Sequence, residues 1–456
     1  MNERHDRQAH MTAGPAGLLR SLDDRVEGIL DACTACGKCV DVCPTPAITG
    51  IDQLDTKAIA AGVLDILRDG EGPEFSHAWA SKCCGSGHCL TVCPEGINPR
   101  FMLTMARRTL AQMAPEDERK ETGKAAFKTM SRAVRVISRL QLPPDLMARL
   151  SPSSHPARET PPDVIFYTGC NMLKTPHIGL LCLDVLDWLD ASYEVHGGPA
   201  NCCGILQLRP GDTDNATRQA GKTLERFAKV GAQDVLSWCP TCQMQFSETL
   251  TSKDADAEGR GLDITMFPVY LAKRLDDLRP LMTTRVEKRV ALHEYPGSPG
   301  VTESVLEILS AIPGLEIIEL EMPKVGYQIT SLVAAPDFMK KHIAGTLKRA
   351  EELDITTLAG VYHADHRELT SHQNQWPFEI VNYMELIGES LGLSRPDIFK
   401  RMKLMQDADA IISDARELIE AYKLDPEEVR DVVINDLLGD QHLPIDRALH
   451  PALDGD

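Results

Sequence analysis

Residues 33–44 read CTACGKCVDVCP, which sets four cysteines in the order Cys-x2-Cys-x2-Cys-x3-Cys-Pro. This is the bacterial spacing for [4Fe–4S] ligands, in which the fourth cysteine of a run binds the other cluster of a pair. The proline ends the loop and turns the last side chain away from the first three. The spacing therefore predicts a dicluster iron–sulfur domain that carries electrons.

A second cysteine run follows at residues 83–94, CCGSGHCLTVCP, with serine where the pattern has its middle cysteine. The crossing rule predicts that the first cluster is bound by Cys33, Cys36, Cys39 and Cys93. It assigns the second cluster to Cys43, Cys83 and Cys89. The pattern supplies no cysteine for the fourth iron of this second cluster, and three alternatives remain. The cluster could be a [3Fe–4S] cluster without that iron, Cys84 could complete a [4Fe–4S] cluster, or the Ser86 oxygen could bind the iron weakly.

The remaining clustered cysteines each follow a predicted strand. Cys170 follows the strand at 164–167, the pair Cys202-Cys203-Gly204 follows the strand at 193–196, and Cys239 and Cys242 follow the strand at 235–238. The carboxyl ends of parallel strands meet at one sheet edge, so these five thiolates could surround one metal centre. Zinc takes four ligands in closed sites, and five cysteines with an adjacent pair favour a polynuclear iron–sulfur centre. Cys182 lies outside the motif, and we expect a buried free thiol there.

The chain divides into segments of different pattern. Short apolar strands alternate with helices after the proline-rich break at 151–162, and the order repeats after residue 280, which predicts two Rossmann-like α/β units with mainly parallel sheets. The expected segments are a flexible arm at 1–25, a helical dicluster domain at 26–112, a helical linker at 113–160, a first α/β unit at 161–279, a second at 280–390 and a helical tail at 391–456.

Composition and charge narrow the function. The 456 residues are 43% hydrophobic and 25% charged, which allows a substantial core. A formal net charge of −19 argues against nucleic-acid binding, which needs a basic surface. Clustered cysteines in a chain of this length indicate metal ligands in a reducing compartment. Without a long apolar run or an apolar N-terminal signal, we expect a soluble, cytoplasmic protein, for which any attachment to a membrane would have to come through a partner.

The cysteine patterns resemble those of known families. The run Cys83-x5-Cys89-x3-Cys93-Pro resembles the second motif of succinate dehydrogenase and fumarate reductase iron–sulfur subunits, where the missing cysteine goes with a three-iron cluster. The five later cysteines resemble the CCG domain of heterodisulfide reductase catalytic subunits and of the iron–sulfur subunits of anaerobic glycerol-3-phosphate dehydrogenase and glycolate oxidase. Those proteins join a ferredoxin-like dicluster domain to two CCG domains. The resemblance implies a non-cubane [4Fe–4S] cluster, the catalytic centre of that family, on Cys170, Cys202, Cys203, Cys239 and Cys242.

The second α/β unit has lost its cysteines. A shift of 124 residues carries Cys239 to His363 and Cys242 to His366, and His293 stands near the position of the first cysteine. A second cluster of the family type is therefore excluded. Three alternatives remain for this half: a zinc or iron ion on the three histidines, a ligand or proton-transfer pocket, or a scaffold without a site.

The chain shows no dinucleotide fingerprint, because Gly85-Ser86-Gly87 lies inside a cysteine loop. The preferred interpretation is an electron-transfer subunit that connects a flavoprotein dehydrogenase partner with a quinone or a membrane acceptor. The alternative is a heterodisulfide reductase-like subunit that reduces a disulfide or another small two-electron substrate at the CCG centre. A sensor or scaffold is a third interpretation, which no DNA-binding motif supports. The donor, the acceptor, the substrate and the oligomeric state do not follow from the sequence.

Overall fold

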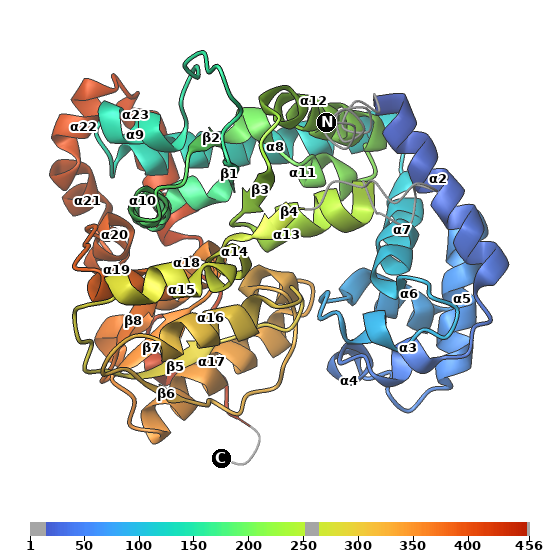
Figure 1. The fold of residues 1–456 in the computed structure, drawn as a ribbon. Coiled ribbons are helices and arrows are strands. Elements are labelled where there is room, and N and C mark those ends of the chain that lie inside the picture. The colour runs from blue at the N-terminus through green and yellow to red at the C-terminus, as the bar shows by residue number, and fades with distance from the viewer. Residues whose placement is uncertain (1–14, 251–263, 454–456) are drawn as a thin grey trace.

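The computed structural model describes residues 15–250 and 264–453. They form a helical N-terminal domain, two α/β units and a helical tail, which confirms the predicted fold class (Figure 1). The two sheets have the same topology, β2-β1-β3-β4 and β6-β5-β7-β8, and every pair of strands in them is parallel. The repeated order gives both units the same edge at which strands end and helices begin.

The N-terminal domain is built from helices that hold two cysteine loops. Its elements are α2 (Pro15–Ala32), α3 (Lys38–Asp41), α4 (Thr45–Thr49), α5 (Thr56–Asp69), α6 (Glu74–Lys82), the 3-10 turn η1 (His88–Thr91) and α7 (Pro99–Gln112). The core between them contains Ile59, Trp79 and Met102, each fully or almost fully buried. Helix α2 begins inside the segment expected to be an arm because Leu18 and Leu22 are buried against the domain; residues 1–14 of that arm lie outside the described part.

A long helix connects this domain with the far end of the molecule. Helix α8 (Glu116–Arg139) leads into α9 (Pro144–Leu150), and buried Val136 and Ile137 on α8 pack in one cluster with the tail. The tail consists of α20 (Ile398–Met405), α21 (Ala408–Asp414), α22 (Arg416–Ala421), α23 (Pro426–Val432) and the π-helix η9 (Val433–Leu438), followed by the 3-10 turn η10 (Arg447–Leu449). The tail therefore continues the fold instead of extending from it.

The first α/β unit surrounds a four-stranded sheet. Its strands are β1 (Val164–Gly169), β2 (Tyr193–Gly197), β3 (Asp234–Ser237) and β4 (Ile264–Met266). Its helices and helical turns are η2 (Asn171–Lys174), α10 (Pro176–Trp188), η3 (Pro199–Asn201), α11 (Ile205–Leu208), α12 (Thr213–Val230), α13 (Pro240–Met244), the π-helix η4 (Gln245–Leu250), α14 (Phe267–Lys273), α15 (Leu275–Leu278) and η6 (Arg279–Leu281). All six residues of β1 are buried, as a central strand covered on both faces requires.

The second unit repeats the plan without cysteines. Its strands are β5 (Arg289–His293), β6 (Glu316–Ile318), β7 (Thr357–Gly360) and β8 (Glu379–Asn382). Its helices and helical turns are α16 (Val301–Ser310), η7 (Ile329–Leu332), α17 (Pro336–Glu352), α18 (His363–Leu369), η8 (Thr370–Gln375) and α19 (Tyr383–Ser390). The alternation in sequence predicted three strands in each unit. The fourth strands, β4 and β8, were not predicted; both lie at a sheet edge and run directly into a helix, α14 or α19, so the apolar residues do not separate strand from helix.

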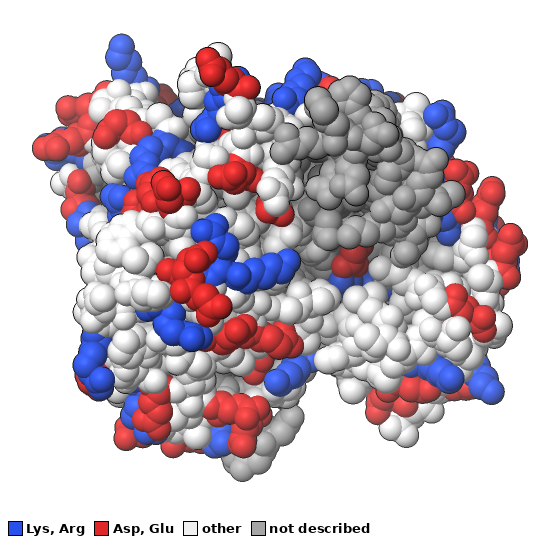
Figure 2. Space-filling view, viewed as in Figure 1, with Lys and Arg blue, Asp and Glu red and all other residues white. Residues whose placement is uncertain are grey.

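The surface gives two further observations. Acidic and basic side chains of the described residues are interspersed on the face shown in Figure 2. Within the described ranges, no helix has the length and apolar character to cross a bilayer.

Aromatic stacking joins the two α/β units. Trp238 at the end of β3 and Tyr383 at the start of α19 stack with ring centroids 5.6 Å apart and planes at 3°, and both rings are buried. Next to this pair, Asp184 on α10 accepts two hydrogen bonds of 2.7 Å from the guanidinium group of Arg395. The two sheets are thus held by both apolar and charged contacts.

We predict that Tyr383→Ala lowers the free energy of unfolding by about 3 kcal/mol, because it deletes a fully buried aromatic ring and leaves a cavity. Trp188→Ala is the matched control: its side chain at the end of α10 is 45% exposed, and we expect a change below about 0.5 kcal/mol. Thermal unfolding followed by circular dichroism measures both. Equal shifts for the two variants would contradict the role of the stack.

Candidate functional site

The cysteines lie in three groups. All 14 fall within the described residues and none forms a disulfide, and Cys182, fully buried on α10, is the one outside the groups. The donor set is therefore made of free thiols, which in the thiolate form are the ligands that iron–sulfur clusters require. The grouping follows from electrostatic neighbours and shared cavities, and the binding of the clusters themselves stays a prediction.

The first group contains the four cysteines that the crossing rule assigned to one cluster. Cys33, Cys36, Cys39 and Cys93 line one small cavity of about 20 Å³ between the two cysteine loops. Burial and the neighbouring Cys33 and Cys36 raise the pKa of Cys39 to about 12. Such a thiol loses its proton only to a strong positive charge, and a coordinated metal supplies one.

The second group lies deeper. Cys43 and Cys83 are the electrostatic neighbours of both Cys84 and Cys89, and burial together with these neighbours raises the pKa of Cys84 to about 11 and that of Cys89 to about 12. The indole N–H of Trp79 donates to Cys43 Sγ at 3.4 Å. Donors to sulfur stabilise the more negative state of a cluster and so raise its reduction potential.

Cys84 belongs to this group by position. Its side chain is 3% exposed, the Thr45 hydroxyl lies 3.9 Å from its sulfur, and the backbone N–H groups of Gly326 and Ser86 donate to it. Ser86 is also buried, and its backbone N–H is the group that reaches Cys84. The sequence left both residues as alternatives, because neighbouring positions in a loop can point in different directions.

The third group occupies the carboxyl edge of the first sheet. Cys170 follows β1, Cys202 and Cys203 follow η3 after β2, and Cys239 and Cys242 begin the segment after β3. Hydrogen bonds from the thiols of Cys170 and Cys203 lower the pKa of Cys202 to about 4, which places the two thiols in direct contact with it. Cys242 in turn contacts Cys203 and Cys239. The five side chains are thus one continuous set, as loops leaving neighbouring parallel strands allow.

Polar groups of the chain also reach this third group. The Tyr167 hydroxyl lies 3.6 Å from Cys242 Sγ and donates to the Asn201 carbonyl at 2.7 Å, and the Gly204 N–H donates to Cys202 Sγ at 3.4 Å. Gly204, the glycine of the CCG motif, has φ of +81°, and a Cβ there would lie 2.4 Å from the Ala216 carbonyl oxygen. Only glycine fits this turn.

A cavity of about 340 Å³ is lined by residues of the dicluster domain and of both α/β units. Its wall includes Cys83 from the second group and Thr241, which stands beside Cys242. Arg100 crosses the wall, pairs with Glu248 and donates to the carbonyls of Gly85 (2.9 Å) and Gly297 (2.6 Å). It therefore ties the dicluster domain to both α/β units.

The three histidines of the second unit have different surroundings. The ring of His293 is tilted against those of Tyr295 and His342, with centroids 5.0 Å and 5.7 Å away, and burial lowers the pKa of His293 to about 3. Burial also lowers the pKa of His363 to about 3, with the charge of Arg367 adding to the effect. His366 instead faces His177, 5.1 Å away between ring centroids. Within the described residues, the groups spaced to hold a metal include His366 but neither His293 nor His363.

Comparisons with known proteins identify two of the cysteine-containing regions. Residues 32–96 match the family described as a 4Fe-4S double cluster binding domain, and residues 164–247 match the family described as a cysteine-rich domain, CCG. The predicted combination of a dicluster domain and a CCG domain is confirmed. No solved structure is significantly similar.

Curated relatives are distant. One component of the dihydromethanophenazine:CoB--CoM heterodisulfide reductase of Methanosarcina mazei is 25% identical over 80% of this chain and 94% of its own length. One component of a fumarate reductase (CoM/CoB) of Methanothermobacter marburgensis is 25% identical over 65% of this chain and 47% of its own length. The predicted resemblance to heterodisulfide reductases is confirmed as distant homology, and both relatives are parts of oxidoreductases.

We predict that Gly204→Ala removes the third group as a metal centre, because the added Cβ collides with backbone and the φ is unfavourable. The protein should lose about four irons per chain and about 2 kcal/mol or more of stability. Gly28→Ala on exposed α2, where a Cβ meets nothing within 4 Å, is the control and should keep all iron. Iron analysis and thermal unfolding of anaerobic samples measure both effects. An unchanged iron content in the Gly204 variant would refute the assignment of the third group as a metal centre.

Proposed function

We propose that the chain is the iron–sulfur electron-transfer subunit of an oxidoreductase complex. It takes electrons from a flavoprotein partner through two ferredoxin-like clusters to the CCG centre, and from there to a quinone or a membrane acceptor. The homology to components of oxidoreductases supports the reaction class. The route and the partners are our inference from the arrangement of the three thiol groups.

The contiguity of the three groups is the observation that carries this proposal. Cys39 of the first group is among the electrostatic neighbours of Cys89 in the second. Cys83 of the second group lines the same cavity as Thr241, which is the sequence neighbour of Cys242 in the third group. Three cysteine groups far from one another would suit a structural role. Three groups that follow one another closely suit the relay of electrons.

The burial of the groups suggests where the partners bind. All four cysteines of the first group are partly exposed, whereas Cys202, Cys203 and Cys242 of the third are buried. We place the contact with the flavoprotein partner at this first group, where a redox protein can approach most closely.

We further propose that the second cluster is a [4Fe–4S] cluster completed by Cys84, which is favoured over the three-iron form and over ligation by Ser86. The Cys84 thiol is buried and has Cys43 and Cys83 as electrostatic neighbours, and thiolate is a stronger iron ligand than a serine oxygen. The resemblance to the fumarate reductase motif, which goes with a three-iron cluster, concerns the missing cysteine at 86 and not this neighbour.

The cavity favours a second candidate function, the reduction of a small anionic substrate beside the CCG centre. Four arginines and one glutamate line it: Arg100, Arg107, Arg108, Arg209 and Glu248. A disulfide-containing or other two-electron acceptor that carries negative charge fits this wall. Since the second unit has lost its thiols, all electrons for such a step would come through the single CCG centre.

The relay is tested with the complex purified anaerobically from its native source. We expect stoichiometric flavin and bleaching of iron–sulfur absorbance when the flavoprotein is reduced. Cys36→Ala should leave flavin reduction intact and slow the bleaching of the remaining clusters by about tenfold or more, because it removes the entry cluster. Thr34→Ala on the same exposed loop is the control. Multiple turnover of small disulfides by the isolated chain with a reduced dye would instead favour the second candidate.

We predict that Cys84→Ser converts the second cluster to the three-iron form. Iron should fall from about 12 to about 11 per chain, and the oxidised sample should gain an electron paramagnetic resonance signal near the free-electron value. Cys182→Ala, outside the three groups, should keep the iron and the spectrum of the unchanged protein. If the unchanged protein already shows the three-iron signal at full intensity, Cys84 is not a ligand.

A further inference from the structure

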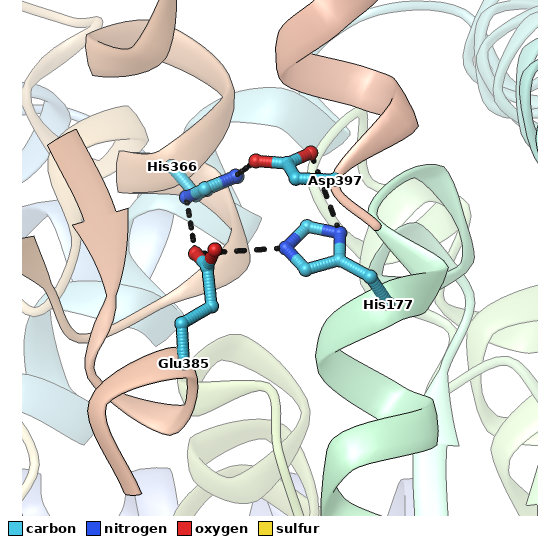
Figure 3. Close-up of side chains that lie close together, drawn as sticks. All are labelled: His177, His366, Glu385 and Asp397. Carbon is cyan, nitrogen blue, oxygen red and sulfur yellow. Dashed lines mark hydrogen bonds and ion pairs between the residues drawn. The ribbon is translucent and has the colours of Figure 1, made fainter. Parts of the chain in front are cut away.

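A ring of four polar side chains is buried between the two α/β units (Figure 3). His177 comes from the start of α10 in the first unit, His366 from α18 and Glu385 from α19 in the second, and Asp397 from the residue before α20. Their ligand atoms all lie within 4.8 Å of one another. His177 is 2% exposed and His366 fully buried. None of the four belongs to the cysteine groups.

Most of the imidazole nitrogens in this ring lack a hydrogen bond. His366 Nε2 lies 2.7 Å from Asp397 Oδ2, but His366 Nδ1 and both nitrogens of His177 are buried without a hydrogen-bond partner. They still point at the carboxylates: His177 Nε2 is 3.7 Å and His366 Nδ1 is 4.0 Å from Glu385 Oε1. Buried polar atoms are rarely left unpaired, so this arrangement calls for a ligand.

The charge of the site points to a cation. Two carboxylates are placed in a largely buried setting, which is costly without compensating positive charge. The nearest lysine on the same segment, Lys400, directs its ammonium group to the Ile380 carbonyl at 2.9 Å. The two positive charges of a divalent metal ion would balance the two carboxylates. The ion would also bind imidazole nitrogens that have no hydrogen-bond partner.

We propose that His177 Nε2, His366 Nδ1 and Glu385 Oε1 bind one zinc ion, with Asp397 accepting hydrogen bonds from the opposite nitrogens of both histidines. Ligand atoms at about 2.0–2.2 Å from zinc lie roughly 3.4 Å apart in a tetrahedral site. The two distances to Glu385 exceed that value by a few tenths of an ångström, which small side-chain rotations close. Two nitrogen ligands and one carboxylate form a common zinc donor set.

Asp397 is already placed to orient both histidines. Asp397 Oδ2 lies against His366 Nε2 and its Oδ1 is 3.5 Å from His177 Nδ1, the arrangement by which a carboxylate orients metal-bound imidazoles. Asp397 Oδ1 also accepts from the Lys400 N–H, and Glu385 Oε1 accepts from the Asn382 N–H. Both carboxylates are therefore fixed by helix caps and need little ordering when the ion binds.

The proposed zinc ion would link the first α/β unit with the second unit and the start of the tail, where none of the three cysteine groups makes such a link. His177 stands on the helix that follows the loop of Cys170, while the other three residues belong to the second unit and the start of the tail. His366 is the position that repeats Cys242 of the first unit. The inference does not depend on the proposed electron route, since it concerns different residues and a redox-inactive ion.

The test measures zinc separately from iron in anaerobically purified protein that has been dialysed against zinc and then against zinc-free buffer. We expect about one zinc per chain, and zinc K-edge absorption with nitrogen and oxygen neighbours at about 2.0–2.1 Å and no sulfur. His177→Ala should lose the zinc and keep iron and visible absorbance. Asp397→Asn should bind zinc about 10- to 100-fold more weakly, as loss of an orienting carboxylate does.

His155→Ala is the matched control, because His155 belongs to the other histidine and carboxylate group of the described chain, with Glu194 and His196. It should keep its zinc. A chelator should lower the thermal midpoint of the unchanged protein by on the order of 5 °C, and that of the His177 variant not at all. Absence of zinc after dialysis, sulfur around the zinc, or loss of zinc from the control instead of the His177 variant would each overturn the proposal.

Discussion

The fold depends on bringing many thiols together in a protein interior. Burial and neighbouring thiols raise the pKa of Cys39 and Cys89 to about 12, so these groups give up their protons only when a metal replaces them. Cluster assembly and folding are therefore coupled, as for other metal sites whose ligands lie far apart in sequence. The helices of the first domain and the parallel strands of the first α/β unit are two ways of meeting this constraint. In both, the cysteines lie in loops that begin where a helix or a strand ends.

The second α/β unit no longer carries thiols, yet its loops support the centres of the other domains. Gly326 donates its N–H to Cys84, and a Cβ on Gly85 would lie 2.6 Å from the Tyr327 ring. Tyr327 is the position that repeats Cys203. The edge that carries the third cysteine group in the first unit thus packs beside Cys84 in its repeat. The second unit therefore contributes to the burial of Cys84 although it has no cysteine of its own.

The sequence predicted much of this and failed at identifiable places. Cysteine spacing specified the groups because each ligand loop is local, and the α/β alternation gave six strands close to their bounds. The edge strands β4 and β8 were missed because each runs directly into a helix, α14 or α19, so the apolar residues do not separate strand from helix. The direction of Cys84 depends on a hydrogen bond from Gly326, far along the chain in the second unit, and no local pattern encodes it. His177, Glu385 and Asp397 share no motif for the same reason.

The histidines show how a correct pattern can lead to an incomplete site. The shift of 124 residues carried the later cysteines onto His363 and His366, but equivalent backbone positions do not give equivalent side-chain surroundings. His363 lies near Arg367 and stays neutral, since burial holds its pKa near 3. His366 turns toward the first unit, where the imidazole of His177 and two carboxylates meet it. The cysteine group of the first unit and His366 of the second unit thus lie at equivalent sheet edges. The two sites differ because the other ligand side chains come from different segments of the chain.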